Sequence, residues 1–167
     1  MGSGKSSIGR LLAKRLGFQF LDTDHLIIER AGMPISEIFA RHGESAFRDM
    51  ETSVIRSIMH LQRCVIATGG GAVLRQENRE LLHQLGFVVG LNAAEDVIFE
   101  RVRRNSKRPL LQTEDPRGTL CKLLGDRRPL YDDASHWTLD TTQLTHDAAV
   151  QEIIRAARRA FSWHRAA

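Results

Sequence analysis

The chain opens on a short run of small residues and one lysine, and this run constrains its fold more than any other feature. Residues 1–7 read MGSGKSS, which matches the end of the phosphate-binding pattern G-x-x-x-x-G-K-[ST]. Glycines in this pattern let backbone N–H groups curl around phosphate oxygens, and the loop leads from a strand into a helix. The run therefore predicts an α/β fold with a phosphate site. A glycine-rich leader without a ligand is the other interpretation.

The residues that follow favour the phosphate loop. Residues 8–16 have the apolar spacing of a helix, and Gly17 is a typical helix end. A helix N-terminus attracts anions, because its dipole and its unpaired N–H groups both favour negative charge. We expect Lys5 to reach the β- and γ-phosphates and the Ser6 hydroxyl to ligate Mg²⁺. The residues expected to contact the nucleotide phosphates are Gly2, Ser3, Gly4, Lys5, Ser6 and Ser7.

The composition is that of one globular domain, residues 1–167, with 42% hydrophobic and 26% charged residues. The net charge of +4 comes from dispersed basic residues and aromatic residues are few, so we expect no nucleic-acid partner. Because no signal peptide or long apolar run is visible, we expect a cytoplasmic protein with no membrane partner. Cys64 and Cys121 are expected to be buried free thiols.

Short apolar strands alternate with amphipathic helices along the chain. The expected strands are 18–21, 64–67, 87–91 and 137–140, and the expected helices are 25–31, 35–41, 44–61, 78–85, 94–104, 117–127 and 146–163. This alternation is typical of a parallel sheet with helices on both faces. Ligands of such sheets bind beyond the carboxyl ends of the strands.

Two carboxylates and a glycine run follow expected strands, so they should lie at one edge of the sheet with the phosphate loop. Asp22 and Asp24 follow the first strand, and Gly69, Gly70 and Gly71 follow the second. In an extended segment the two carboxylates point the same way. One could hold Mg²⁺ through water while the other accepts a proton from a hydroxyl; helix capping by Asp24 is the other interpretation. Three successive glycines favour close backbone approach to a ligand over a plain turn.

Arginines mark three further segments. Arg48 follows Phe47 on a long expected helix, Arg108 opens the segment RPLL, and residues 127–131 read RRPLY. The planar guanidinium suits carboxylate and phosphate ligands. Each arginine taken singly is typical of a solvated surface, whereas their combination with the glycine run favours anion binding.

Taken in order, these motifs resemble the shikimate kinase family. The markers are residues 2–6, 22–24, 47–48, 69–71, 108–111 and 127–131. The resemblance implies a three-layer P-loop kinase fold, in which a parallel sheet has the strand order 2-3-1-4-5. It also implies ATP and Mg²⁺ as nucleotide and metal, and shikimate as the small-molecule substrate, phosphorylated at its 3-hydroxyl.

The resemblance further implies a role for each marker residue. Ser6 binds Mg²⁺, and Asp22 reaches the metal through water. Asp24 holds the acceptor hydroxyls and is the candidate base, while Arg48 and Arg127 grip the shikimate carboxylate. The substrate-binding set is Asp24, Arg48, Gly69, Gly70, Gly71 and Arg127, and the catalytic set is Asp24, Lys5 and Arg108.

Two segments and an adenine site complete what the resemblance implies. The shikimate-binding segment spans about 24–61, and a lid spans about 108–118, with Arg108 at its start reaching the transferring phosphate. Arg101 matches the position that lies against adenine. A second adenine-side position falls near Gln143 or Leu144, and the sequence leaves this register open.

One part of the family pattern has no counterpart in the sequence. The family's first strand and first loop glycine are missing, and in the resembling fold that strand is the centre of the sheet. Its neighbours would then lose ladder partners, and each buried unsatisfied backbone group costs about 1–3 kcal/mol. We therefore expect the natural product to begin roughly ten residues upstream, about the length of a strand with its turn.

Three functions compete at this point. The first is an active, monomeric shikimate kinase. The second is a related small-molecule kinase such as a gluconate kinase, which gives no reason for two carboxylate-gripping arginines beside a glycine run. The third is a non-catalytic, shikimate-kinase-like ligand-sensing domain, which should carry a DNA-binding region and a damaged acceptor site. The presence of Asp24, Arg48 and Arg127 favours the enzyme.

Overall fold

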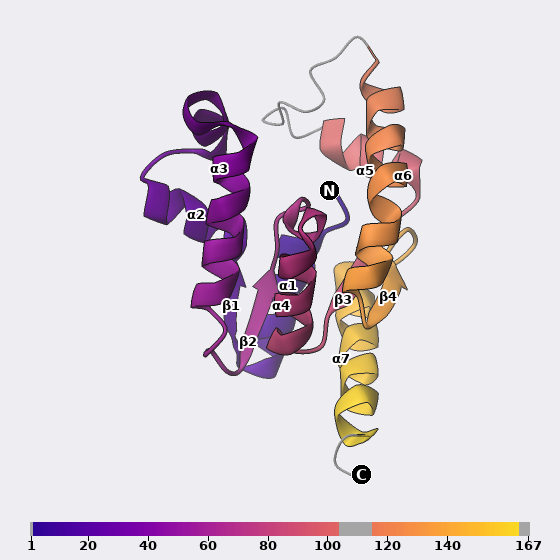
Figure 1. Ribbon diagram of the computed structural model, residues 1–167. Coiled ribbons are helices and arrows are strands. Elements are labelled where there is room, and N and C mark those ends of the chain that lie inside the picture. The colour runs from indigo at the N-terminus through magenta and orange to yellow at the C-terminus, as the bar shows by residue number, and fades with distance from the viewer. Residues whose placement is uncertain (1, 104–114, 164–167) are drawn as a thin grey trace.

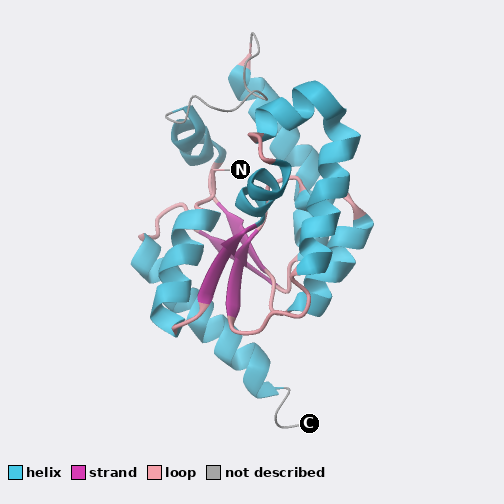
Figure 2. Ribbon diagram, turned by 90° about the vertical axis from the view of Figure 1, so that its left-hand side faces the viewer, coloured by secondary structure: helices cyan, strands magenta, loops and turns pink. Residues whose placement is uncertain are grey.

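The computed structural model describes residues 2–103 and 115–163 and has an α/β architecture (Figure 1). The strands are β1 (Gln19–Asp22), β2 (Cys64–Ala67), β3 (Val89–Asn92) and β4 (Trp137–Asp140). The helices are α1 (Lys5–Leu16), α2 (Thr23–Ala31), α3 (Ile35–Ser57), α4 (Gln76–Leu85), α5 (Glu95–Arg103), α6 (Pro116–Ala134) and α7 (His146–Trp163), with a short 3₁₀ turn η1 (Ala72–Leu74). Figure 2 shows helices on both sides of the strands.

All strand pairing in the described part of the chain is parallel, as the sequence predicts. β1 pairs with β2, with Gln19 opposite Cys64 and Asp22 opposite Ala67. β3 pairs with β4, with Val89 opposite Trp137. The described strands thus form two separate pairs, where the sequence predicted members of one sheet.

The bounds of α1 follow from glycines at both ends. Gly4 precedes the helix with φ 89°, and Gly17 follows it with φ 65° while donating its N–H to Ala13 O. Both values lie in the left-handed region, where glycine avoids the steric cost of a Cβ. Gly17 therefore ends the helix as predicted, but the helix begins at Lys5, directly within the phosphate-loop run.

Two helices differ most from their predicted bounds. Residues 35–41 and 44–61 were expected as two helices; α3 runs over both up to Ser57, with a kink at Gly43 (φ 79°, ψ 175°). α6 was expected to end at residue 127 but continues to Ala134 with Pro129 inside it. Proline commonly breaks a helix because it lacks an N–H donor and its ring crowds the preceding turn. The predicted helix therefore ended before Pro129, which was too early.

The buried apolar residues form three clusters rather than one. The first joins α1 to α7 and β4; its buried members are Ile8, Leu139, Ala149, Val150 and Ile153. The second joins α2 to α3 through Ile27, Ile38, Phe47 and Val54. The third joins α5 to α6 through Ile98, Val102 and Leu120. Since full burial of one such aliphatic side chain stabilises a fold by about 1.5–3 kcal/mol, each cluster fixes the elements that it joins.

The structure also bears on the cysteines and on membrane-spanning helices. Cys64 and Cys121 are free thiols as predicted, but both are partly exposed rather than buried. Among the described helices, none combines the length and apolar character that crossing a bilayer requires.

Candidate active site

The phosphate-loop run lies at the start of α1 with the backbone shape that a loop of this kind needs. Gly2 and Gly4 both have positive φ, at 70° and 89°. Ser3 is buried, with 3% of its surface exposed. A Cβ at Gly2 would overlap the side chain of Val102 on α5. The loop is therefore closely packed at Gly2, while the N-terminus of α1 carries no side-chain cap and offers its N–H groups to an anion.

Ser6 and Asp22 meet next to this helix start. The Ser6 hydroxyl donates a hydrogen bond of 2.7 Å to Asp22 Oδ2, and Asp22 Oδ1 accepts the backbone N–H of Asp24 at 3.1 Å. Asp22 is thus the N-cap of α2 and Asp24 lies in its first turn. The expected extended segment is wrong, because the helix begins at Thr23. The alternative interpretation, helix capping by Asp24, does not hold either, since Asp22 caps the helix.

The glycine run after β2 is packed against three side chains. The Gly69 N–H donates to Thr23 Oγ1 at 3.1 Å, and Thr23 is fully buried. A Cβ at Gly69 would overlap the carboxylate of Asp24. At Gly71, a Cβ would overlap the guanidinium of Arg48. Close approach at these glycines therefore brings Asp24 and Arg48 to the end of β2, and contact with a ligand there stays a prediction.

Arg48 lies in a group of charged side chains that we call the arginine cluster, comprising Arg48, Glu44 and Glu51 on α3 and Arg127 on α6, whose charge acts on Glu51. The Arg48 guanidinium donates to Glu51 Oε2 at 2.5 Å and to Glu44 Oε1 at 2.8 Å. The Arg48 side chain is 12% exposed and that of Glu51 only 2%. Burial lowers the pKa of Arg48, but hydrogen bonds and attraction from Glu51 and Glu44 outweigh it, so its pKa is raised overall. Arg48 therefore remains positively charged, and Glu51 and Glu44 hold its guanidinium in a fixed orientation.

Glu51 is the residue of this cluster that the sequence reading missed. Burial raises the pKa of its carboxyl, helped by the negative charge of Asp24 and opposed by Arg48. Its Oε1 accepts no hydrogen bond from any described residue. The available signal was the i, i+3 spacing from Arg48 to Glu51, which places both side chains on one face of a helix.

Arg127 reaches the same glycine run from α6. Its Nη1 donates to Gly70 O at 3.4 Å, and the Tyr131 hydroxyl donates to the same carbonyl at 2.6 Å. Burial raises the pKa of Tyr131, against the opposing charge of Arg127. Tyr131 belonged to the RRPLY segment but had no assigned role. Arg127 and Tyr131 are one helical turn apart, so the longer α6 explains how both reach Gly70.

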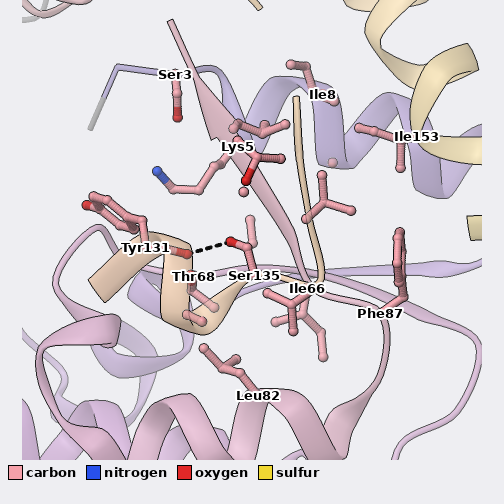
Figure 3. Close-up of a pocket in the computed structure, with 18 of the residues that line it drawn as sticks. Ser3, Lys5, Ile8, Ile66, Thr68, Leu82, Phe87, Tyr131, Ser135 and Ile153 are labelled. Atoms are coloured by element: carbon pink, nitrogen blue, oxygen red, sulfur yellow. Dashed lines mark hydrogen bonds between the residues drawn. The ribbon is translucent and has the colours of Figure 1, made fainter. Parts of the chain in front are cut away.

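The structure thus brings most of the predicted residues to one end of the strands. Figure 3 shows Lys5, Thr68 and Tyr131 among the residues that line one cavity. Arg101 lies apart, on α5 in a shallow hollow with Asp96. Arg108 and most of the predicted lid lie outside the described residues. Leu144 packs against the core cluster of α1 and α7, whereas Gln143 is exposed.

The residues that could hold a metal are Ser6 and Asp22, because both present oxygen atoms within hydrogen-bond distance of each other. Among the described residues there is no group of three or more His, Cys, Asp or Glu side chains arranged for a metal. The donor set therefore fits a hard cation whose remaining ligands come from phosphate and water, as Mg²⁺ prefers.

Comparison with known proteins agrees with this geometry. The family model described as shikimate kinase matches residues 1–158. A shikimate kinase of Thermodesulfovibrio yellowstonii is 48% identical over 159 residues, which is 95% of this chain and 91% of the relative. One from Geobacter metallireducens is 46% identical over 153 residues, 92% of this chain and 85% of the relative.

A solved structure gives the same result. It is described as shikimate kinase from Acinetobacter baumannii in complex with shikimate, and it has a TM-score of 0.89 and 42% sequence identity to this chain. The match covers 93% of this chain and 87% of that structure. A second structure, of shikimate kinase from Bacteroides thetaiotaomicron, has a TM-score of 0.85 and 29% identity. The chain therefore belongs to the shikimate kinase family.

Proposed function

We propose that this protein transfers the γ-phosphoryl group of ATP to the 3-hydroxyl of shikimate. The observation that carries this proposal is the meeting of two arginines from distant helices, Arg48 and Arg127, at a glycine run beside Asp24. The phosphate loop at the start of α1 lies at the same end of the strands, through the Ser6–Asp22 bond. One end of the molecule thus offers a site for a polyphosphate and a site for a carboxylate.

The carboxylate of shikimate suits the arginine cluster. Arg48 and Arg127 present planar forks whose paired N–H donors match the two oxygens of a carboxylate. Arg48 is held in place by Glu51 and Glu44 before any ligand arrives, so little side-chain freedom is lost on binding. The Gly70 carbonyl anchors Arg127 on the other side. We place Gly69, Gly70 and Gly71 against the substrate through their backbone.

Asp24 is placed to act on the acceptor hydroxyl. It lies in the first turn of α2, against Gly69 and therefore next to the glycine run. The acceptor oxygen forms a bond to the γ-phosphorus as the bond from that phosphorus to the β–γ bridging oxygen breaks, which leaves ADP. Asp24 accepts the hydroxyl proton, and Lys5 offsets negative charge on the phosphoryl group.

Mg²⁺ would be held by the Ser6 hydroxyl and, through water, by Asp22. When bound, the metal neutralises charge on the β- and γ-phosphates. The role of Asp22 is double in this arrangement, because the same carboxylate caps α2 and so fixes the start of the helix that carries Asp24. We assign Arg101 to the adenine side, and residues 24–61, with Asp24 and Arg48, to the acceptor side.

The test is an assay of ADP release with ATP and Mg²⁺, with and without shikimate, and with ³¹P NMR to identify the product. We expect shikimate-dependent ADP release and a new phosphomonoester, and no turnover with gluconate. Lys5→Ala should abolish turnover, while Lys14→Ala, an exposed lysine on the same helix, should not. Binding of shikimate without ADP release would instead support the ligand-sensing interpretation.

A further inference from the structure

The turn that follows the glycine run is held by two neighbouring residues of α4. η1 has only three residues, so its last carbonyl groups lie beyond the reach of its own N–H groups. Asn78, which is fully buried, donates from Nδ2 to Ala72 O at 3.0 Å. Arg79 donates from Nη1 to Val73 O at 2.8 Å. The position of η1 therefore depends on side chains of α4.

Arg79 also joins this turn to α6. Its Nε donates to Asp133 Oδ2 at 2.5 Å, while its Nη1 is bonded to Val73 O. One guanidinium can contact two elements at once because its donors lie in a fixed, planar fork. We call the three residues Val73, Arg79 and Asp133 the Arg79 tether. Asp133 is mostly exposed, and ion pairs with an exposed partner add little stability, so the tether should matter more for geometry than for the free energy of unfolding.

The hydrogen-bond ladder of α6 is interrupted close to Arg127. Pro129 lies inside this helix, two residues after Arg127. Proline has no N–H to donate to the carbonyl four residues earlier, that of Gly125, and its ring crowds the same turn. Helices bend most readily at such positions. The backbone of α6 alone therefore does not fix the direction of the turns that follow Pro129.

Contacts with the glycine run and η1 hold those turns at two points. The Tyr131 hydroxyl donates to Gly70 O at 2.6 Å. The Arg79 tether attaches Asp133, two residues further along the helix. A single attachment would leave the end of the helix free to turn about it, whereas two attachments also fix its direction. The bend at Pro129 is therefore set from outside the helix.

The position of Arg127 depends on this bend. Its Nη1 lies 3.4 Å from Gly70 O, which is long for a hydrogen bond and holds the guanidinium only weakly. Arg127 is one helical turn before Tyr131, on the same face of α6. A different bend at Pro129 would therefore move the Arg127 guanidinium relative to the glycine run.

We propose that Arg79 is a positioning residue for Arg127. By holding Val73 O and Asp133 together, it fixes the bend of α6 and keeps the Arg127 guanidinium at the glycine run. The ligand that this positioning serves, the carboxylate of shikimate, comes from the proposed function, and the inference rests on it in this respect. Loss of Arg79 should weaken acceptor binding and leave the nucleotide site at the start of α1 unchanged.

The first test is steady-state kinetics of the full chain with ATP, Mg²⁺ and shikimate. Arg79→Ala should raise KM for shikimate at least about threefold, because small displacements of a binding group are costly, while KM for ATP stays the same. Asp133→Asn should act in the same direction with a smaller effect. Asp132→Asn is the matched control, because it makes the same change at the neighbouring exposed residue. An unchanged KM in Arg79→Ala, or an equal rise in the two aspartate variants, would overturn the proposal.

A double substitution shows whether Arg79 acts through Arg127. Once Arg127→Ala has removed the guanidinium that is to be positioned, adding Arg79→Ala should raise KM for shikimate no further. If the two effects multiply instead, Arg79 acts independently of Arg127 and the proposal fails.

The second test needs no activity and uses Tyr131, the single tyrosine of the chain. Tyrosine labelled with ¹³C at Cζ gives one NMR signal, which reports the hydrogen bond from this hydroxyl to Gly70 O. In Arg79→Ala the signal should move toward its position in urea-unfolded protein, whereas Asp132→Asn should leave it in place. If Arg79→Ala does not fold, Asp133→Asn takes its place in both tests.

The two readouts together separate this inference from the proposed function. A chain that does not phosphorylate shikimate would contradict the proposed function, and the Tyr131 signal would then decide alone: a moved signal supports the positioning role and an unmoved one overturns it. In an active enzyme, a moved signal with an unchanged KM for shikimate would make Arg79 a purely structural residue, which also overturns the proposal.

Discussion

The phosphate loop and the arginine cluster, the two anion sites of the proposed function, lie at the same end of the strands, yet they are built differently. The loop offers backbone N–H groups, shaped by positive φ at Gly2 and Gly4. The cluster offers side chains that arrive from α3 and α6, held by Glu51 and by Gly70 O. The loop therefore depends on local backbone shape, whereas the cluster depends on contacts between segments far apart in the sequence. Substitutions should therefore affect one of these two sites without affecting the other.

The largest effect is expected at Asp24, which lies between the two sites. Asp24→Asn keeps the size of the side chain and removes its charge, and loss of a general base costs about 10²–10⁴-fold in rate. kcat should fall by that factor while the affinity for an ATP analogue is unchanged, as steady-state kinetics and calorimetry would measure. Near-normal kcat would show that positioning of the acceptor alone suffices.

The next effect is expected for Arg127, which tests the side-chain site alone. Arg127→Ala removes a charge-assisted pair with the acceptor carboxylate, worth about 1.5–3 kcal/mol, so KM for shikimate should rise at least about tenfold. KM for ATP should stay the same. Arg128→Ala is the matched control, because Arg128 is the exposed neighbour on the same helix. An unchanged KM for shikimate in the Arg127 variant would remove this residue from the acceptor site.

A smaller effect is expected for a methyl group at Gly71. Its backbone (φ −100°, ψ −5°) accepts alanine, but the added Cβ would overlap the Arg48 guanidinium. Overpacking of this kind costs about 1–3 kcal/mol, and urea unfolding of Gly71→Ala should show that loss. Gly125→Ala, in α6 with open space at the Cβ, should instead be neutral or slightly stabilising. Equal stability of both variants would mean that Arg48 moves aside freely.

The smallest effect is expected in the pH dependence of stability. Glu51 has a raised pKa in the folded protein, mainly because it is buried. The folded state then binds more protons than the unfolded state above the ordinary value of 4.5, so stability should fall as pH rises from there through the folded pKa. Urea unfolding from pH 4 upward should show this slope, and Glu51→Gln should flatten it. If the pH dependence of stability were the same in the Glu51→Gln variant, titratable groups other than Glu51 would be its cause.

The strands and the phosphate loop could be predicted from the sequence because their signals are local. The bounds of β2 and β4 match the predicted 64–67 and 137–140, and Gly17 ends α1. The resemblance supplied the site residues, and the structure brings Asp24, Arg48 and Arg127 together around the glycine run.

The rest depended on contacts that a linear pattern does not contain. Asp22 and Asp24 are both good helix caps, and only the fold decides that Asp22 caps α2. Glu51 reads as an ordinary exposed helix residue until α3 is packed against the glycine run, where its exposed fraction is 1%. Tyr131 and Gly70 are 61 residues apart in the sequence, so their hydrogen bond could not be anticipated without the length of α6.

The close approach of Gly71 to Arg48 also has an evolutionary consequence. A mutation to alanine at 71 should be harmful while Arg48 is present, because the new methyl group and the guanidinium would overlap. It should become tolerable only after Arg48 has been replaced by something smaller, and under the proposed function that first step already weakens binding of the acceptor carboxylate. The two positions are therefore epistatic: the effect of changing one depends on which residue occupies the other. We therefore expect a lineage that keeps the arginine to keep the glycine as well.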